Sequence, residues 1–146
     1  MALPDFVTLV GGVNRTTGIT SQSIASGTNF IGSTIDNAAN LDAILDLEII
    51  WQYATAPTAN SSVRIYLRYA LDGVNFETAN TTDEPVWLAQ VAGFSPPANT
   101  NQYRIVRGDI PLLPYPFQIV VRNHDTTQPI TVTVNAVTRK DAQVID

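Results

Sequence analysis

The sequence predicts an all-β fold, an antiparallel β-sandwich of jelly-roll type with about eight strands. Apolar and polar residues alternate with a period of two over several segments, as they do in strands whose successive side chains point to opposite faces of a sheet. No segment keeps the i, i+3, i+4, i+7 spacing of an amphipathic helix between a cap and a glycine. Proline-, glycine- and asparagine-rich stretches separate the alternating segments at the intervals expected of short strands.

The longest alternation runs from Leu41 to Tyr53. Its odd positions are apolar, and its even positions are mostly acidic or polar, with two isoleucines among them. The apolar set is Leu41, Ala43, Leu45, Leu47, Ile49, Trp51 and Tyr53, and the even set is Asp42, Ile44, Asp46, Glu48, Ile50 and Gln52. We expect a strand with one face in the core and the carboxylates on the outer face.

A second strand is expected over Val63–Leu71. Val63, Ile65, Leu67, Tyr69 and Leu71 alternate with Arg64, Tyr66, Arg68 and Ala70. Asp72-Gly73 then predicts a tight turn, because glycine adopts a positive φ without a Cβ clash.

The remaining elements complete the sandwich. Further strands are expected over Pro85–Ala92, Gln102–Ile110, Pro116–Asn123 and Ile130–Thr138, and weaker ones over Phe6–Val10 and Ile19–Ala25. Apolar residues are sparse before residue 36, so we expect residues 1–35 to form an N-terminal arm that can hold a short edge strand, and residues 36–146 to form the sandwich domain.

Composition limits the classes of partner. Charged residues make up 14% of the 146 residues, against about 25% in an average protein, and such a surface suits burial against neighbours as well as it suits a threonine-rich β protein. A net charge of −5 with Lys140 as the single lysine argues against nucleic acid. No apolar stretch approaches the ~20 residues of a membrane span, and the N-terminus lacks a signal-peptide pattern.

The sequence offers no catalytic, cofactor-binding or metal-binding residues. The single histidine, His124, lies beside Asp125 in a polar turn, where we expect it to be exposed. The outer carboxylates of the 41–53 strand lack the burial that raises a catalytic pKa. Asp72-Gly73-Val74-Asn75 lacks the further acidic ligands of a calcium hand. We therefore expect a protein that is not an enzyme and has no cysteine-based metal site or disulfide.

Two groups of residues are candidates for an interface. Trp87, Phe94 and Tyr115 flank proline-rich loops, where they either pack at the edge of the core or dock on a partner. Ile44, Ile50 and Val120 interrupt outward-facing polar rows. Either the N-terminal arm or neighbouring subunits of a homotrimer would cover the second group, and the low charge content favours the homotrimer.

Three segments together carry a resemblance to a known group of proteins. They are Asp36-Asn37-Ala38-Ala39-Asn40-Leu41, then Tyr69-Ala70-Leu71-Asp72-Gly73-Val74-Asn75-Phe76-Glu77, and the stretch from Ile110 to Asn123. In this order the chain resembles, over roughly residues 36–138, small virion proteins of tailed bacteriophages, which include capsid decoration (cement) proteins. The resemblance implies a jelly-roll-like sandwich, commonly trimeric, that binds the outside of the head and bridges subunits of the major capsid protein.

The sequence thus predicts a structural protein of a phage particle, made in the host cytoplasm and located on the capsid surface. Its expected partners are further copies of itself and the major capsid protein. Alternatives are a carbohydrate- or receptor-binding module of a tail fibre or baseplate, and a head-completion or tail-tube protein.

Overall fold

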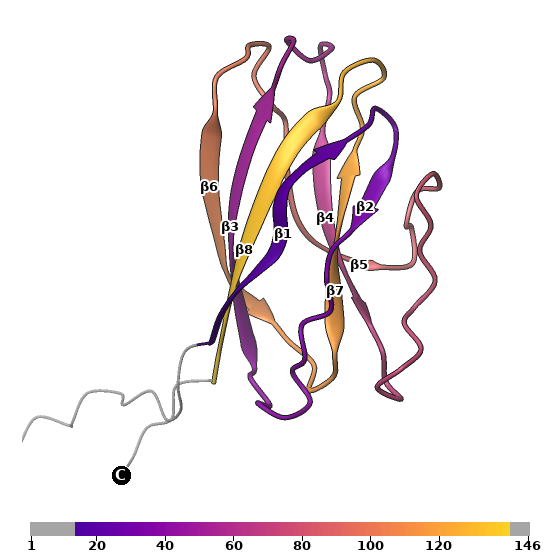
Figure 1. Cartoon of the computed structure of the whole chain (residues 1–146), viewed down its shortest axis with the longest axis vertical. Helices are drawn as coiled ribbons and strands as arrows, with labels where there is room; N and C mark the ends of the chain where they lie inside the picture. Colours follow the sequence, from indigo (N-terminus) through magenta and orange to yellow (C-terminus); the bar gives the residue numbers. More distant parts are fainter. Residues whose placement is uncertain (1–13, 141–146) are drawn as a thin grey trace, which may run out of the picture.

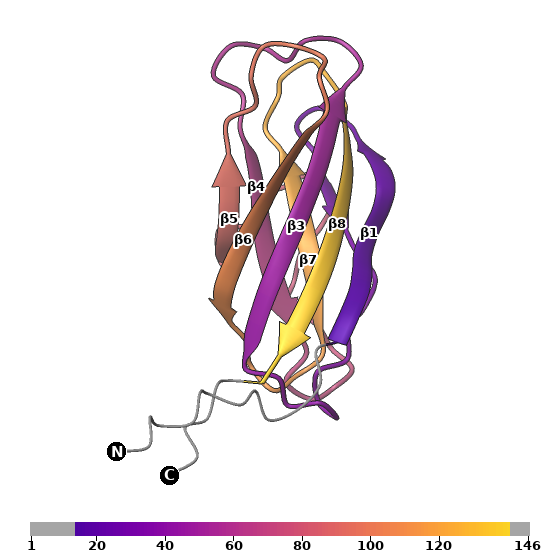
Figure 2. The same ribbon diagram turned by 90° about the vertical axis from the view of Figure 1, so that its left-hand side faces the viewer.

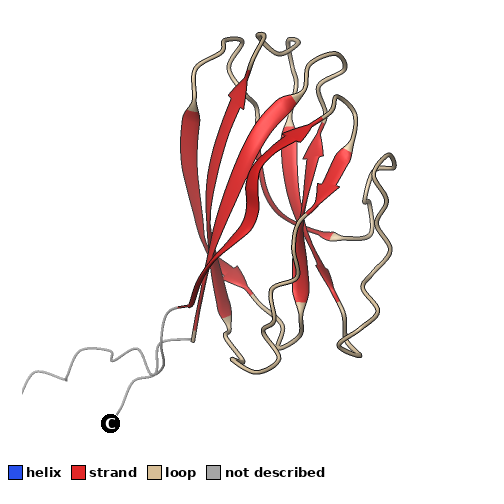
Figure 3. Ribbon diagram, in the orientation of Figure 1, coloured by secondary structure: helices blue, strands red, loops and turns tan. Residues whose placement is uncertain are grey.

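The computed structural model describes residues 14–140, and within them every regular element is a strand (Figure 3). The eight strands are β1 (Asn14–Ile24), β2 (Asn29–Ile31), β3 (Ile44–Tyr53), β4 (Val63–Tyr69), β5 (Ala89–Phe94), β6 (Tyr103–Pro111), β7 (Phe117–Asn123) and β8 (Ile130–Arg139). The all-β prediction is confirmed.

The strands form two four-stranded sheets that pack face to face (Figure 1). The first sheet has the order β1-β8-β3-β6, seen from its outer side in Figure 2, and the second has the order β2-β7-β4-β5. All neighbouring strands are antiparallel. Because every connection except β4–β5 crosses between the sheets, this order is that of a jelly roll.

The core lies between the sheets and has the composition that the alternation predicts. Its central residues come from β3 and β4 and are at most 8% exposed: Leu45, Leu47, Ile49, Trp51, Val63, Ile65, Leu67 and Tyr69. Inward-facing residues of β7 and β8 complete it, among them Ile119 and Val134. These apolar faces leave water only when the two sheets pack together, which is the main stabilisation of the sandwich.

The N-terminal part of the described chain belongs to the sandwich and not to an arm. β1 pairs with β8 along its whole length, and β2 pairs with β7, so residues 14–31 supply an edge strand to each sheet. Edge strands bury fewer side chains, and only Ile19 and Ile24 of β1 are buried in the core, which explains the sparse apolar residues. The predicted strand at Phe6–Val10 lies outside the described residues.

Two local predictions can be compared with the structure, one for the turn at Asp72-Gly73 and one for the side chain of Asp42. Gly73 has φ of +81°, and the Asp72 carboxylate accepts hydrogen bonds from the backbone N–H groups of Val74 and Asn75, so the predicted turn is confirmed. The prediction that Asp42 faces outward is wrong. β3 begins at Ile44, so Asp42 lies outside the alternating strand; it is buried, and its carboxylate accepts a hydrogen bond from the Thr138 hydroxyl at 2.6 Å.

Candidate binding surfaces

The outer face of the second sheet is covered by the loop between β4 and β5. Tyr66 of β4 and Val120 of β7 point outward, yet both are buried because they pack against Leu88 and Ala79 of this loop. Backbone carbonyls of the loop also accept hydrogen bonds from Asn29 of β2, whose side chain is buried. We call residues 77–88 the covering loop.

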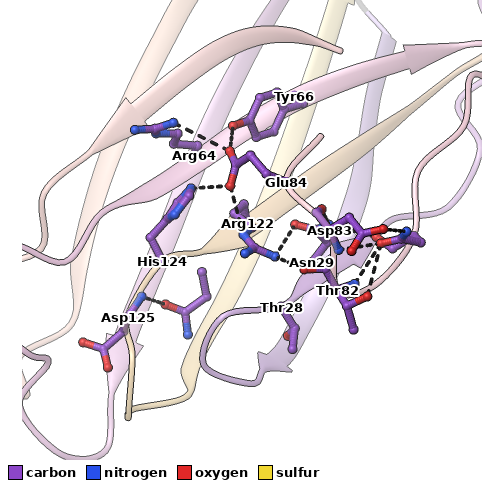
Figure 4. A network of polar contacts seen from close by, with 12 residues as sticks. Thr28, Asn29, Arg64, Tyr66, Thr82, Asp83, Glu84, Arg122, His124 and Asp125 are labelled. Carbon is purple, nitrogen blue, oxygen red and sulfur yellow. Dashed lines mark hydrogen bonds and ion pairs between the residues drawn. The ribbon is translucent and has the colours of Figure 1, made fainter. Parts of the chain in front are cut away.

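Glu84 holds the covering loop on the sheet (Figure 4). Its carboxylate accepts a hydrogen bond from the Tyr66 hydroxyl at 2.7 Å and lies 3.3 Å from Nε of Arg122 and 3.6 Å from Nη1 of Arg64. Arg64 and Arg122 are directly opposed in the β4–β7 register. Two like charges opposite each other destabilise a sheet, and the carboxylate between them offsets this repulsion.

His124 belongs to this network and is not an exposed turn residue. Its Nε2 lies 3.3 Å from the Glu84 carboxylate, and its side chain is half-buried. Burial lowers the pKa of His124, and the charges of Arg64 and Arg122 act in the same direction against the opposing effect of Glu84. The lowered pKa disfavours the charged imidazolium, which fits a side chain packed beside two arginines.

Asp125, the neighbour of His124, is directed to different partners. Its carboxylate accepts hydrogen bonds from the backbone of Thr58, Thr127 and Gln128 and from the Ser61 hydroxyl. Burial by itself raises the pKa of Asp125, but these donors outweigh it and hold that pKa below its usual range. The His124-Asp125 pair is therefore split between two structural networks, which join loops at one end of the sandwich.

The predicted interface residues do not share one surface. Ile44 and Ile50 lie half-buried on the outer face of the first sheet. Val120 was expected to face a partner, and that prediction is wrong, because Val120 is 0% exposed under the covering loop of the same chain. Neither the N-terminal arm nor a second subunit is what covers it.

The three aromatic candidates also differ in their burial. Phe94 stacks on Trp51 with ring centroids 4.0 Å apart, and Tyr115 packs against the core, so both have the core-edge role. Trp87 is 64% exposed at the end of the covering loop, where its Nε1 donates a hydrogen bond to the Thr78 carbonyl at 3.0 Å. Among these aromatics, Trp87 presents the free ring surface.

A shallow groove of about 540 Å³ crosses the outer face of the first sheet. Its lining comes from all four strands and includes Val106, Ala136 and Val137 together with Arg15 and Glu48. Val106 is 63% exposed, although it lies within a strand. The groove lies one side-chain row from Ile50, because Glu48 pairs with Val106 and Ile50 with Arg104.

A second exposed surface lies at one end of the sandwich, where the β2–β3, β4–β5 and β6–β7 loops meet. Backbone and asparagine hydrogen bonds join the β2–β3 loop to the β6–β7 loop, and Ala70 donates to the Pro116 carbonyl. Large apolar side chains are exposed on these loops: Leu41, Leu71, Val74 and Leu113.

Sequence reasoning did not find the Glu84 network or the groove. Both depend on strand register, which brings Arg64 opposite Arg122 and Glu48 opposite Val106. The available sequence signal for the Glu84 network was that Arg64 and Arg122 both occupy outward positions of the predicted strands. Over residues 14–140, no group of three or more His, Cys, Asp or Glu side chains is placed to hold a metal ion, and no helix is long and apolar enough to cross a membrane.

Comparison with known proteins bears on the fold. No protein-family model and no curated protein matches the chain. A chain from the structure of infectious bursal disease virus, Gx strain, aligns over 88% of this protein with a TM-score of 0.54 and 10% identity. A chain from the Gt strain aligns over 88% with a TM-score of 0.51 and 11% identity. This protein spans 32% of the length of each. At such identity the likeness is one of fold, and the chain shares its jelly-roll architecture with these viral chains.

Proposed function

We propose that this protein is a structural component of a bacteriophage particle, and more specifically a decoration protein that binds the outside of the capsid. The observation that carries the proposal is a jelly roll with few surface ions and several exposed large apolar side chains. Among the described residues these side chains are Leu41, Leu71, Val74, Val86, Trp87, Val106 and Leu113. Surfaces of this kind are typical of proteins that bind neighbours.

Two further observations support the proposal. The fold is shared with chains from a virus structure, and three segments of the sequence resemble virion proteins of tailed phages. On this proposal the partners are the major capsid protein and further copies of the chain, and synthesis takes place in the host cytoplasm. We propose no catalytic activity, and hydrolysis of a glycan or ester that is lost in His124→Ala would overturn this part.

Copy number tests the location. Particles purified from the host of this sequence should contain a 15.8 kDa band whose amount, measured by gel densitometry, is comparable to that of the major capsid protein. A few copies per particle would contradict decoration and favour a fibre or baseplate position. Absence of the band from purified particles would overturn the virion role.

We further propose a homotrimer whose contacts include Ile50. Light scattering after size exclusion should give three times 15.8 kDa for the unsubstituted chain at micromolar concentration. Ile50→Asp should weaken the association, because it would place an unpaired carboxylate in the contact. Asn101→Asp, which adds the same charge at an exposed loop residue, is the control. A 15.8 kDa monomer for the unsubstituted chain would contradict the trimer.

Binding of a carbohydrate receptor is a second candidate, favoured by Trp87. An exposed indole that is fixed through its N–H can stack on a sugar ring. The chain has two tryptophans, and Trp51 is buried in the core, so a glycan that changes the accessible tryptophan fluorescence reports on Trp87. The change should be absent in Trp87→Phe, and a panel of host-surface glycans without effect would contradict this candidate.

A further inference from the structure

We infer that the groove on the outer face of the first sheet binds a neutral, linear oligosaccharide that lies across its strands. The groove has a volume of about 540 Å³, and residues of β1, β8, β3 and β6 line it. This volume falls within the range of small-molecule sites, about 300–1,000 Å³. The inference does not depend on the virion role, and the site is separate from Trp87, which lies at the second sheet.

A row of polar side chains crosses the sheet at the groove. The Thr17 hydroxyl of β1 donates a hydrogen bond to the Asn135 side chain of β8 at 3.2 Å, and the Asn135 amide donates to Glu48 of β3 at 2.8 Å. Glu48 also forms an ion pair with Arg104 of β6 at 3.1 Å. Because neighbouring strands lie about 4.8 Å apart, the row presents polar groups at a spacing similar to the width of a pyranose ring.

The side chains of this row are fixed in place and still have hydrogen-bonding capacity. A carboxylate oxygen has two lone pairs, a side-chain amide has two N–H donors, and a hydroxyl both donates and accepts. The contacts of Asn135 with Thr17 and Glu48 orient these groups and use part of that capacity. Groups that are held before binding lose less conformational entropy when the ligand arrives. The hydroxyls of a sugar, which also donate and accept, match such a row.

The charges at the groove favour a neutral ligand. Asp46 of the lining lies 2.9 Å from Nε of Arg139, and Glu48 has its own arginine partner. A cation would compete with these arginines, and the described part of the chain holds no group of three or more His, Cys, Asp or Glu placed to bind a metal ion. An anionic ligand would approach two carboxylates, and only Arg15, on the edge strand β1, adds a positive charge to the lining.

The groove does not suit the centre of a contact between proteins. The centre of such contacts is depleted in charged residues, whereas Glu48 and Asn135 lie on the two central strands of the sheet. An apolar partner surface would remove water from them without replacing its hydrogen bonds. Val106 and Val137 of the lining offer small apolar contacts for the C–H groups of a sugar ring. Ile50, the proposed subunit contact, lies one side-chain row beyond the groove.

Titration of the full chain with neutral hexasaccharides tests the inference. The probes are cellohexaose, maltohexaose, xylohexaose and mannohexaose at about 10 mM, above the millimolar Kd of a weak complex. At least one of them should shift the backbone amide NMR signals of Thr17, Glu48 and Asn135 and leave those of the covering loop unchanged. No shift with any of the four would overturn the inference. Shifts confined to the surroundings of Trp87 would also overturn it, and so would tighter binding of hexagalacturonic acid than of every neutral probe.

Matched threonine variants test the polar row. Thr17→Ala should weaken binding of the active probe about tenfold, because it removes a hydrogen-bonding group from the lining. Thr131→Ala is the control, since Thr131 is also an exposed threonine of the first sheet but lies four residues from Asn135 along β8, outside the groove. Its affinity should equal that of the unsubstituted chain. Equal losses in the two variants would contradict the assignment.

A further variant fills the groove and keeps the polar row. Val137 is half-buried in the lining, and Val137→Phe places a larger side chain there. Binding of the active probe should be lost, while urea unfolding remains cooperative and shows that the variant is folded. Binding that persists in folded Val137→Phe would overturn the placement of the sugar. The copy number of the protein in particles has no bearing on this result, so the virion role and the groove are tested separately.

Discussion

Replacing Glu84 with alanine should destabilise the protein far more than an average surface substitution. The change removes the acceptor of the Tyr66 hydroxyl and leaves Arg64 and Arg122 facing each other across the β4–β7 register. Arg122 is the more consequential of the two, because its side chain is 12% exposed against 44% for Arg64. A guanidinium that is largely removed from water then has no carboxylate beside it.

The expected magnitude follows from these contacts. The lost hydrogen bond to a charged acceptor is worth about 1.5–3 kcal/mol. Breaking a fully buried ion pair costs about 3–5 kcal/mol, but Glu84 is 30% exposed, so the Arg122 contribution is smaller than that. The exposed Arg64 pair adds at most about 1 kcal/mol. Since these contributions overlap, we expect Glu84→Ala to lower the free energy of unfolding by about 2–4 kcal/mol.

Glu48→Ala is the matched control. The Glu48 side chain is 31% exposed, nearly the same as that of Glu84, but its partner Arg104 is 65% exposed. Glu48 also accepts a hydrogen bond from the Asn135 side-chain amide at 2.8 Å, so its removal should cost about 1–2 kcal/mol. This is less than for Glu84, because no largely buried guanidinium is left without a carboxylate. Urea unfolding monitored by tryptophan fluorescence measures both values, and proteolysis should cut the covering loop faster in Glu84→Ala alone. If the two variants differ by less than about 0.5 kcal/mol, the structural role of the Glu84 network is wrong.

Three further predictions concern the core, a turn and pH. Leu47→Ala should lower the free energy of unfolding in urea by about 2–5 kcal/mol, because the 0% exposed side chain leaves a cavity, and a loss below 1 kcal/mol would refute the core assignment. Gly73→Val should lower the free energy of unfolding by more than about 1 kcal/mol, because valine is strained at φ of +81°. Added calcium should not raise the melting temperature of the unsubstituted protein, and a rise would show an ion bound at this turn. The depressed pKa of Asp125 stabilises the fold above the unfolded-state value near 4, and this contribution is lost as pH falls through the folded pKa. Asp125→Asn should therefore be less stable at pH 7 and lose less stability on acidification, measured by melting across pH; equal acid sensitivity of the two proteins would count against this role.

The period of two was sufficient to predict the core because each strand has one side that only another apolar surface can cover. Leu45, Leu47 and Ile49 were therefore assigned correctly from sequence spacing alone. β2 was missed because three residues, Asn29–Ile31, are too few to show a period. Asp42 was misplaced because β3 begins only at Ile44, so the alternation does not extend to Asp42, which is held instead by hydrogen bonds with Asn37 and Thr138.

Alternation identifies the side of a sheet on which a residue lies but not what covers that side. Tyr66 and Val120 do point away from the core, as the pattern predicts, yet a loop distant in sequence buries them. The covering loop itself has no periodicity, and its attachment through Glu84 depends on the register of β4 and β7. Register is set by the whole sandwich, which is why neither a local pattern nor the residue types of the loop predicted this network.

The two outer faces of the sandwich consequently differ in what they can bind. The second sheet has its outward apolar residues, Tyr66 and Val120, covered by its own chain, and Glu84 forms ion pairs with Arg64 and Arg122 beside them. The first sheet keeps Val106 exposed and Ile50 half-exposed on its outer side, with no comparable loop over them in residues 14–140. An additional segment or subunit gains apolar burial on the first sheet, whereas on the second it would first have to displace the covering loop and separate Glu84 from Arg122. The proposed contacts are therefore assigned to the first sheet on energetic grounds, and not only because it carries the groove.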